Sequence, residues 1–175
     1  MSSTEHAPPP KNIGGWLILV GIGLVISPFQ LLFLLNTNFV PLFRDGTLEY
    51  LINPIYDSYH PFWGPLIYGE VFINILILCI SFLLIYLFFT KSYRFPHIYI
   101  FLKAFSLVFV IVDTALLPIV VPTETVFTPE TIGEIIGVAI SAAIWIPYML
   151  VSVRVKETFV DTRADASDAS VIERF

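Results

Sequence analysis

Long apolar segments alternate with polar ones along the 175 residues of this chain. At a helical rise of about 1.5 Å per residue, each apolar segment is long enough to cross the roughly 30 Å hydrocarbon layer of a bilayer. The alternation therefore predicts an all-α fold, that of a polytopic membrane protein whose four transmembrane helices form a bundle. The expected spans cover residues 13–36, 65–90, 97–122 and 131–153.

The polar segments complete the expected organisation. Residues 1–12 contain three consecutive prolines, which favour an extended, disordered tail. The loop 37–64 is rich in aromatic residues, and we expect a short interfacial helix within it over residues 48–52. Residues 161–175 are polar and acidic, which predicts a second disordered tail. The folded part is then a transmembrane domain over residues 13–160.

Basic residues gather on one side of this topology. Four spans place the N-terminal tail, the 91–96 loop and the C-terminal edge together, and lysine and arginine near spans favour the cytoplasmic side. The opposite side has only Arg44 in the 37–64 loop and no basic residue in the 123–130 turn. We therefore predict that both termini are cytoplasmic, in a bacterial-type inner (cytoplasmic) membrane. The basic residues of the cytoplasmic side are Lys11, Lys91, Arg94, Arg154 and Lys156.

Composition supports a membrane location. Hydrophobic residues make up 57% of the chain and charged residues 13%, against about 45–50% and about 25% in soluble domains. The formal net charge is −5 and no basic face is evident, which argues against nucleic acid as a partner. The single cysteine, Cys79, cannot form an internal disulfide. The first apolar segment lacks a small-residue cleavage site, so we interpret it as a retained anchor helix.

Three acids and one amide lie at membrane depth in the outer half of the expected bundle: Glu70, Asn74, Asp113 and Glu134. An ionisable residue there costs about 2.5–3.5 kcal/mol on insertion scales, so each needs a reason. One interpretation is structural, with the groups protonated, hydrogen-bonded between helices or placed in the interface. The other is a polar pocket that binds a proton, a cation or a polar group, since carboxylates placed together favour proton binding. Both interpretations stay open.

Two further features concern helix contacts. Lys103 lies inside the cytoplasmic end of the third span, and we expect its long stem to return the ammonium group to that interface. Small residues recur at four-residue spacing in the first and fourth spans, where they allow close approach of another helix. These are Gly23, Ser27, Gly133, Gly137 and Ser141. Packing within the bundle is one interpretation of this spacing, and dimerisation is the other.

Enzyme motifs are absent from the sequence. There is no HExxH segment and no Walker loop. The histidines His6, His60 and His97 fall on the tail, the outer loop and the inner boundary, so they cannot share a metal site in this topology. Only Asp113 supplies an aspartate within the spans, which excludes a two-aspartate protease site. We therefore expect no catalytic residues, no cofactor and no metal.

Several segments resemble a bacterial inner-membrane family known as domain of unknown function 2569. They are the opening Ile13-Gly14-Gly15-Trp16-Leu17, the loop end Tyr59-His60-Pro61-Phe62-Trp63, Glu70 with Asn74, and the ending from Tyr148 to Val160. The resemblance implies a small four-span inner-membrane protein and carries no activity. It also draws attention to Arg154 and Lys156 as candidate contacts for anionic lipid headgroups or a cytoplasmic partner. The alternative is that they are ordinary basic anchors on the cytoplasmic side of the membrane.

These observations predict a small integral membrane protein of unknown molecular function. The leading hypothesis is a non-catalytic accessory or interaction subunit, with a membrane-protein partner or a second copy of the chain. The first alternative is a small proton- or cation-linked transporter that uses the acids of the outer half. The second alternative is a lipid-binding or sensory protein acting through the 37–64 loop.

Overall fold

The computed structural model of the protein describes residues 11–121 and 127–160. The tails over 1–10 and 161–175, and residues 123–126 of the expected turn, lie outside the described residues. The described chain is helical and has no strand. Its helices are α1 (Trp16–Arg44), α2 (Thr47–Ile52), α3 (Trp63–Phe89), α4 (Arg94–Val120), α5 (Pro129–Val151) and α6 (Val153–Thr158).

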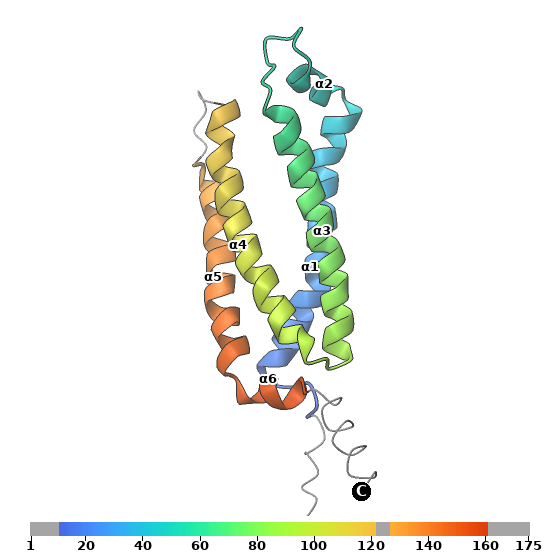
Figure 1. Cartoon of the computed structure of the whole chain (residues 1–175), viewed down its shortest axis with the longest axis vertical. Coiled ribbons are helices and arrows are strands. Elements are labelled where there is room, and N and C mark those ends of the chain that lie inside the picture. Colours follow the sequence, from blue (N-terminus) through green and yellow to red (C-terminus); the bar gives the residue numbers. More distant parts are fainter. Residues whose placement is uncertain (1–10, 122–126, 161–175) are drawn as a thin grey trace, which may run out of the picture.

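Four helices, α1, α3, α4 and α5, are long and apolar enough to cross a membrane. The prediction of an all-α, four-transmembrane-helix bundle is therefore confirmed. The bundle has two distinct ends, which we call the α2 end and the α6 end after the short helix that lies at each (Figure 1). Helices α1 and α4 run toward the α2 end, and helices α3 and α5 run back toward the α6 end.

The four long helices form an open arc. Helix α1 packs on α3, α3 on α4, and α4 on α5, whereas α1 and α5 share no extended contact that would close the ring. The α1–α3 pair and the α4–α5 pair converge at the α6 end and separate toward the α2 end (Figure 1). Helix packing is thus tight at one end of the bundle and loose at the other.

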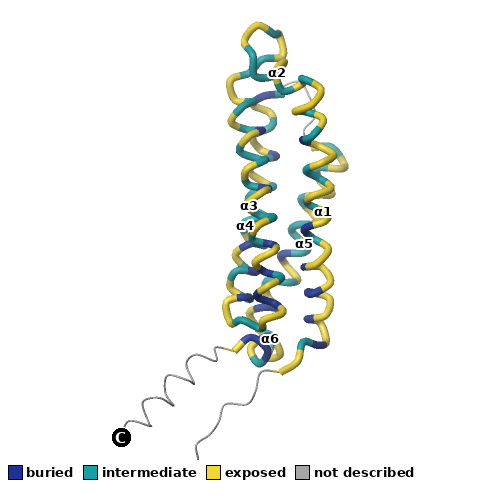
Figure 2. Tube along the Cα trace, turned by 90° about the vertical axis from the view of Figure 1, so that its right-hand side faces the viewer, coloured by how far each residue is buried: buried dark blue, intermediate teal, exposed yellow. Residues whose placement is uncertain are grey.

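The packed core lies at the α6 end, where Figure 2 shows most of the buried residues. Its centre is Phe88 of α3, which is 1% exposed and whose ring lies 5.1 Å from that of Phe95 and 5.9 Å from that of Phe159, between ring centroids. Phe159, which follows α6, is itself buried. Gly21 of α1 faces the Phe88 ring, and a Cβ there would lie 2.9 Å from Phe88 Cε1. The missing side chain of Gly21 therefore lets α1 approach α3.

Helix α1 extends past the predicted end of the first span at residue 36 and ends at Arg44. The polar residues after 36 do not stop it, and the hydroxyl of Thr37 donates to the carbonyl of Phe33 (2.9 Å) within the helix. The helix ends where Gly46 adopts a positive φ of 76°, in the left-handed region. The expected loop 37–64 is therefore partly helical. The short helix expected over 48–52 is present as α2.

We predict that Phe88→Ala lowers the free energy of unfolding by about 3 kcal/mol, because removing a buried phenylalanine leaves a cavity. Phe72 of the same helix is 66% exposed, so Phe72→Ala is a matched control, and its effect should stay within about 0.5 kcal/mol. Steric trapping of the purified protein in lipid bicelles measures both values. Equal losses for the two variants would contradict the placement of the core.

Candidate functional site

A cavity of about 340 Å³ lies between α3 and α4 near the α2 end, and we call it the α3–α4 cleft. Its walls are almost entirely apolar, with Ile73 and Phe109 among them. Glu70 of α3 and Asp113 of α4 are its acidic residues. Each lies seven residues from its helix end at that side, which is about 10 Å along the axis. The cleft thus brings two carboxyl groups from different helices to the same depth.

Local helix geometry explains the position of Asn74. It lies one turn beyond Glu70 on the same face of α3, and it is 8% exposed. Its amide nitrogen donates to the backbone carbonyl of Glu70 (2.9 Å). Asn74 therefore has a partner within its own helix, and it extends the polar face of α3 below the α3–α4 cleft.

The third acid, Glu134, lies on α5, the helix that packs against α4. Its side chain is exposed and does not line the α3–α4 cleft. Among the described residues no basic residue lines the cleft, and Arg44, the basic residue of the 37–64 loop, forms no ion pair with these acids. Residues 11–121 and 127–160 also contain no group of three His, Cys, Asp or Glu residues arranged to hold a metal ion.

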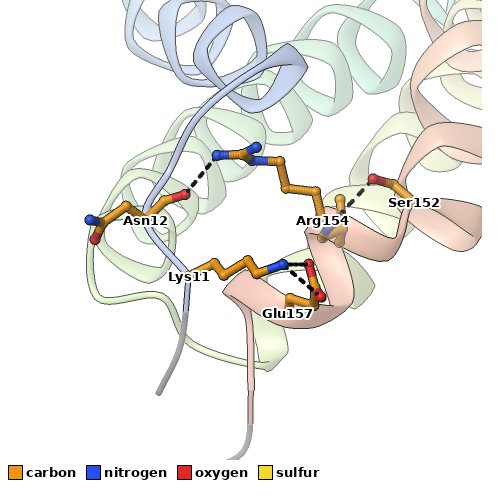
Figure 3. A network of polar contacts seen from close by, with 6 residues as sticks. Lys11, Asn12, Ser152, Arg154 and Glu157 are labelled. Carbon is orange, nitrogen blue, oxygen red and sulfur yellow. Dashed lines mark hydrogen bonds and ion pairs between the residues drawn. The ribbon is translucent and has the colours of Figure 1, made fainter. Parts of the chain in front are cut away.

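At the α6 end, polar contacts join the segment before α1 to α6 (Figure 3). Lys11 forms an ion pair with Glu157 (2.8 Å), and its backbone nitrogen donates to the carbonyl of Glu157 (3.0 Å). Arg154 donates to the carbonyl of Asn12 (3.4 Å). A Cβ on Gly14 would overlap the Arg154 guanidinium group, so the glycine leaves room for it.

These contacts bear on two candidate residues and one boundary. Arg154 is exposed, yet part of its guanidinium group contacts its own chain, whereas Lys156 is simply exposed. Residues 11 and 12, which we expected to belong to the N-terminal tail, are held against α6. The basic residues at this end therefore tie the chain together as well as facing the surroundings.

The structure corrects the expectation for Lys103. Its ammonium group does not return to the end of the bundle but donates to the hydroxyl of Ser141 on α5 (3.1 Å). Ser141 lies ten residues before the end of α5, about 15 Å along the axis. A serine on the facing helix offers a nearer polar partner than the interface does. Lysine and serine in two separate spans gave no local signal of this pairing.

Lys103 lies in a second cavity, also of about 340 Å³, which all four long helices line and which we call the Lys103 chamber. The sequence analysis did not predict this chamber. A usable signal was the pair of polar residues one turn apart on α1, Ser27 and Gln30, together with the similar pair Lys103 and Ser106 on α4. Its polar side chains are Ser27, Gln30, Ser81, Lys103, Ser106 and Ser141.

The small residues do not serve helix packing as expected. A Cβ added at Gly23, Gly133 or Gly137 would meet no atom within 4 Å. The interpretation that they allow close packing within the bundle is therefore wrong for these three positions. Gly23 lines the Lys103 chamber, and the two α5 glycines are exposed.

The fold defines a four-helix membrane protein with an acidic cleft toward one end and a polar chamber nearer the other. Residues 10–160 match the family model described as "Protein of unknown function (DUF2569)", so the chain belongs to this family. The resemblance noted in the sequence is thereby confirmed. Neither a search of curated proteins nor a search of solved structures finds a match.

Proposed function

We propose that the protein is non-catalytic and binds a proton or a small cation in the α3–α4 cleft, as part of proton- or cation-linked transport. The observation that carries the proposal is that Glu70 and Asp113, from two helices, line one apolar cavity without a basic partner. Two carboxyl groups in an apolar site cannot both stay ionised at low cost. Binding a proton or a cation removes the repulsion between them. The apolar walls favour a proton or an organic cation over a hydrated metal ion.

Polar residues also recur on α3 and α4 between the α3–α4 cleft and the Lys103 chamber. On α3, Ser81 follows Asn74 after two turns, and on α4, Ser106 precedes Asp113 after the same spacing, so each pair shares a helix face. The polar residues therefore run from the α3–α4 cleft toward the Lys103 chamber. Such a succession of polar groups is better suited to passing a proton along the helices than to a purely structural contact between two side chains.

Infrared difference spectroscopy tests this proposal directly. On changing the pH, the purified protein should show a carboxyl band that Asp113→Asn and Glu70→Gln each diminish and that the double variant removes. Glu49 of α2 is exposed and lies outside the bundle, so Glu49→Gln is the control and should keep the band. A band that survives in the double variant would remove both carboxyls from the proposed site.

A second candidate function is that of an accessory or interaction subunit. The observation that favours it is the open surface at Gly133 and Gly137, which are exposed and meet nothing within the described chain. Small residues on a membrane helix let a second helix approach closely. The partner is then a transmembrane helix of another protein or of a second copy of this chain.

Gly137→Leu should release such a partner, because the added side chain fills open space in this chain and blocks close approach only from outside. Ala143→Leu is the control, since Ala143 is exposed on the same helix but about 240° around it. Native mass spectrometry of protein purified at endogenous levels measures the mass of the assembly. A wild-type chain that is always alone would rule this candidate out.

We also propose that the α6 end faces the cytoplasm of a bacterial inner membrane, with both termini inside. The basic residues Lys11, Lys91, Arg154 and Lys156 all lie near the α6 end, which agrees with the preference of such residues for the cytoplasmic side. Helix α2 and the acidic cleft then lie toward the outside.

Cysteine labelling in spheroplasts tests the orientation. The background is Cys79→Ala, which removes the only native thiol. Ser58→Cys, exposed near α2, should react with an impermeant maleimide at once, whereas Thr90→Cys, exposed in the turn between α3 and α4, should react only after permeabilisation. The reverse pattern would invert the topology.

A further inference from the structure

The Lys103 chamber contains a positive charge without a negative partner. The ammonium group of Lys103 has two neighbours, the neutral hydroxyl of Ser141 at 3.1 Å and the ring of Tyr99, whose centroid lies 5.7 Å away. Within residues 11–121 and 127–160 it forms no ion pair. Asp113 lies on the same helix, but about 15 Å further along the axis. Whether the Lys103 side chain is charged or neutral, its polar group therefore costs free energy, because lipid at this depth offers it no polar partner.

The other polar groups of the chamber are hydrogen-bond donors. Ser27 and Ser81 turn their hydroxyls to carbonyls of their own helices, at 3.1 and 2.8 Å. No hydrogen bond within the described chain occupies the side chains of Ser106 or Gln30. An anion beside Lys103 would accept hydrogen bonds from the ammonium group and from the free donors of Ser106 and Gln30. Hydrogen bonds to an ionised acceptor are stronger than those between neutral groups. No carboxylate lines the chamber to oppose it.

The surroundings of the chamber indicate how such an anion arrives. The six polar residues lie about 12–21 Å from the α6 end of their helices, well inside the bundle. At the α6 end the packed core, with Phe88, Phe95 and Phe159, lies between the chamber and that end of the bundle. Helices α1 and α5 share no extended contact, and exposed Leu19 of α1 lines the chamber at this side. The open approach is therefore lateral, from the surrounding lipid.

We propose that the Lys103 chamber binds the anionic headgroup of a membrane lipid, which enters between α1 and α5 with its acyl chains left against the apolar helix faces. To reach Lys103 the headgroup moves about 14 Å inward from the α6 end between α1 and α5, while its acyl chains stay in an apolar environment. A free hydrated anion would have to cross the apolar layer alone. The ligand class is thus an acidic amphiphile, and the site is separate from the α3–α4 cleft.

Native mass spectrometry of the delipidated full-length protein tests the proposal with two probes, phosphatidylglycerol and phosphatidylcholine of identical acyl chains. Wild type should bind the acidic lipid at least about tenfold more tightly. Lys103→Gln should abolish this preference, and Lys103→Arg should keep it because the charge remains. Lys156→Gln removes an exposed charge at the α6 end and should also keep it. If Lys156→Gln loses the preference and Lys103→Gln keeps it, the acidic lipid binds at the exposed surface of the α6 end. That result would overturn the proposal.

A second variant leaves Lys103 in place. Gly23 lines the chamber, and an added Cβ meets nothing within 4 Å, so Gly23→Leu should fill the space and reduce binding of the acidic lipid by about tenfold or more. Ala143→Leu adds bulk on an exposed part of α5 that does not line the chamber and should leave binding unchanged. Unchanged binding in Gly23→Leu would overturn the proposal. Displacement of the lipid by inorganic phosphate alone would also overturn it, since the site would then hold a free anion.

Discussion

The packing of aromatic rings around Phe88 is the interaction on which the rest of the bundle depends. In lipid, helices gain little from burying apolar surface against each other, so association has to come from close fit and from polar contacts. At the α6 end the fit is supplied by Phe88, Phe95 and Phe159, and by the space that Gly21 leaves for Phe88. The ion pair between Lys11 and Glu157 is exposed, and such pairs contribute only about 0–1 kcal/mol. The aromatic contacts therefore hold α1, α3 and α4 together at this end, with Phe159 after α6 packed against them.

The open half of the bundle follows from this one-sided packing. Because α1 and α5 share no extended contact and the helix pairs separate toward the α2 end, interior space remains that side chains do not fill. The α3–α4 cleft is part of the space toward the α2 end, and the Lys103 chamber lies deeper, where α1 and α5 share no extended contact. A bundle packed equally along its length would have covered Glu70 and Asp113 with neighbouring side chains. The carboxyls are accessible because the structure concentrates its close contacts elsewhere.

Properties that depend on the chain's overall hydrophobic pattern could be predicted from sequence. The four spans and the short helix α2 follow from long apolar runs and from a polar segment with aromatic residues. That Glu70 and Asp113 lie within about one helical turn of each other in depth follows from counting residues in the expected antiparallel spans 65–90 and 97–122. Such predictions need only the rise of a helix and the thickness of a bilayer, which are the same for every protein.

Properties that depend on which helix faces which could not be predicted. The direction of Lys103 is decided by Ser141, 38 residues away in the chain. The role of each glycine depends on its neighbour, so Gly21 faces Phe88 while Gly23, only two residues on, faces open space. The full length of α1 was also missed, since polar residues such as Thr37 do not by themselves end a helix.

The two polar regions of the bundle cannot neutralise each other. Lys103 and Asp113 lie ten residues apart on α4, about 15 Å along the axis. At an effective dielectric constant of about 20, two unit charges at that distance interact by only about 1 kcal/mol. That is less than the roughly 2.5–3.5 kcal/mol that one charged residue costs at membrane depth. Each region therefore has to be compensated locally. Acids on three helices and a lysine among hydroxyls call for ligands of opposite charge, so one binding event cannot satisfy both.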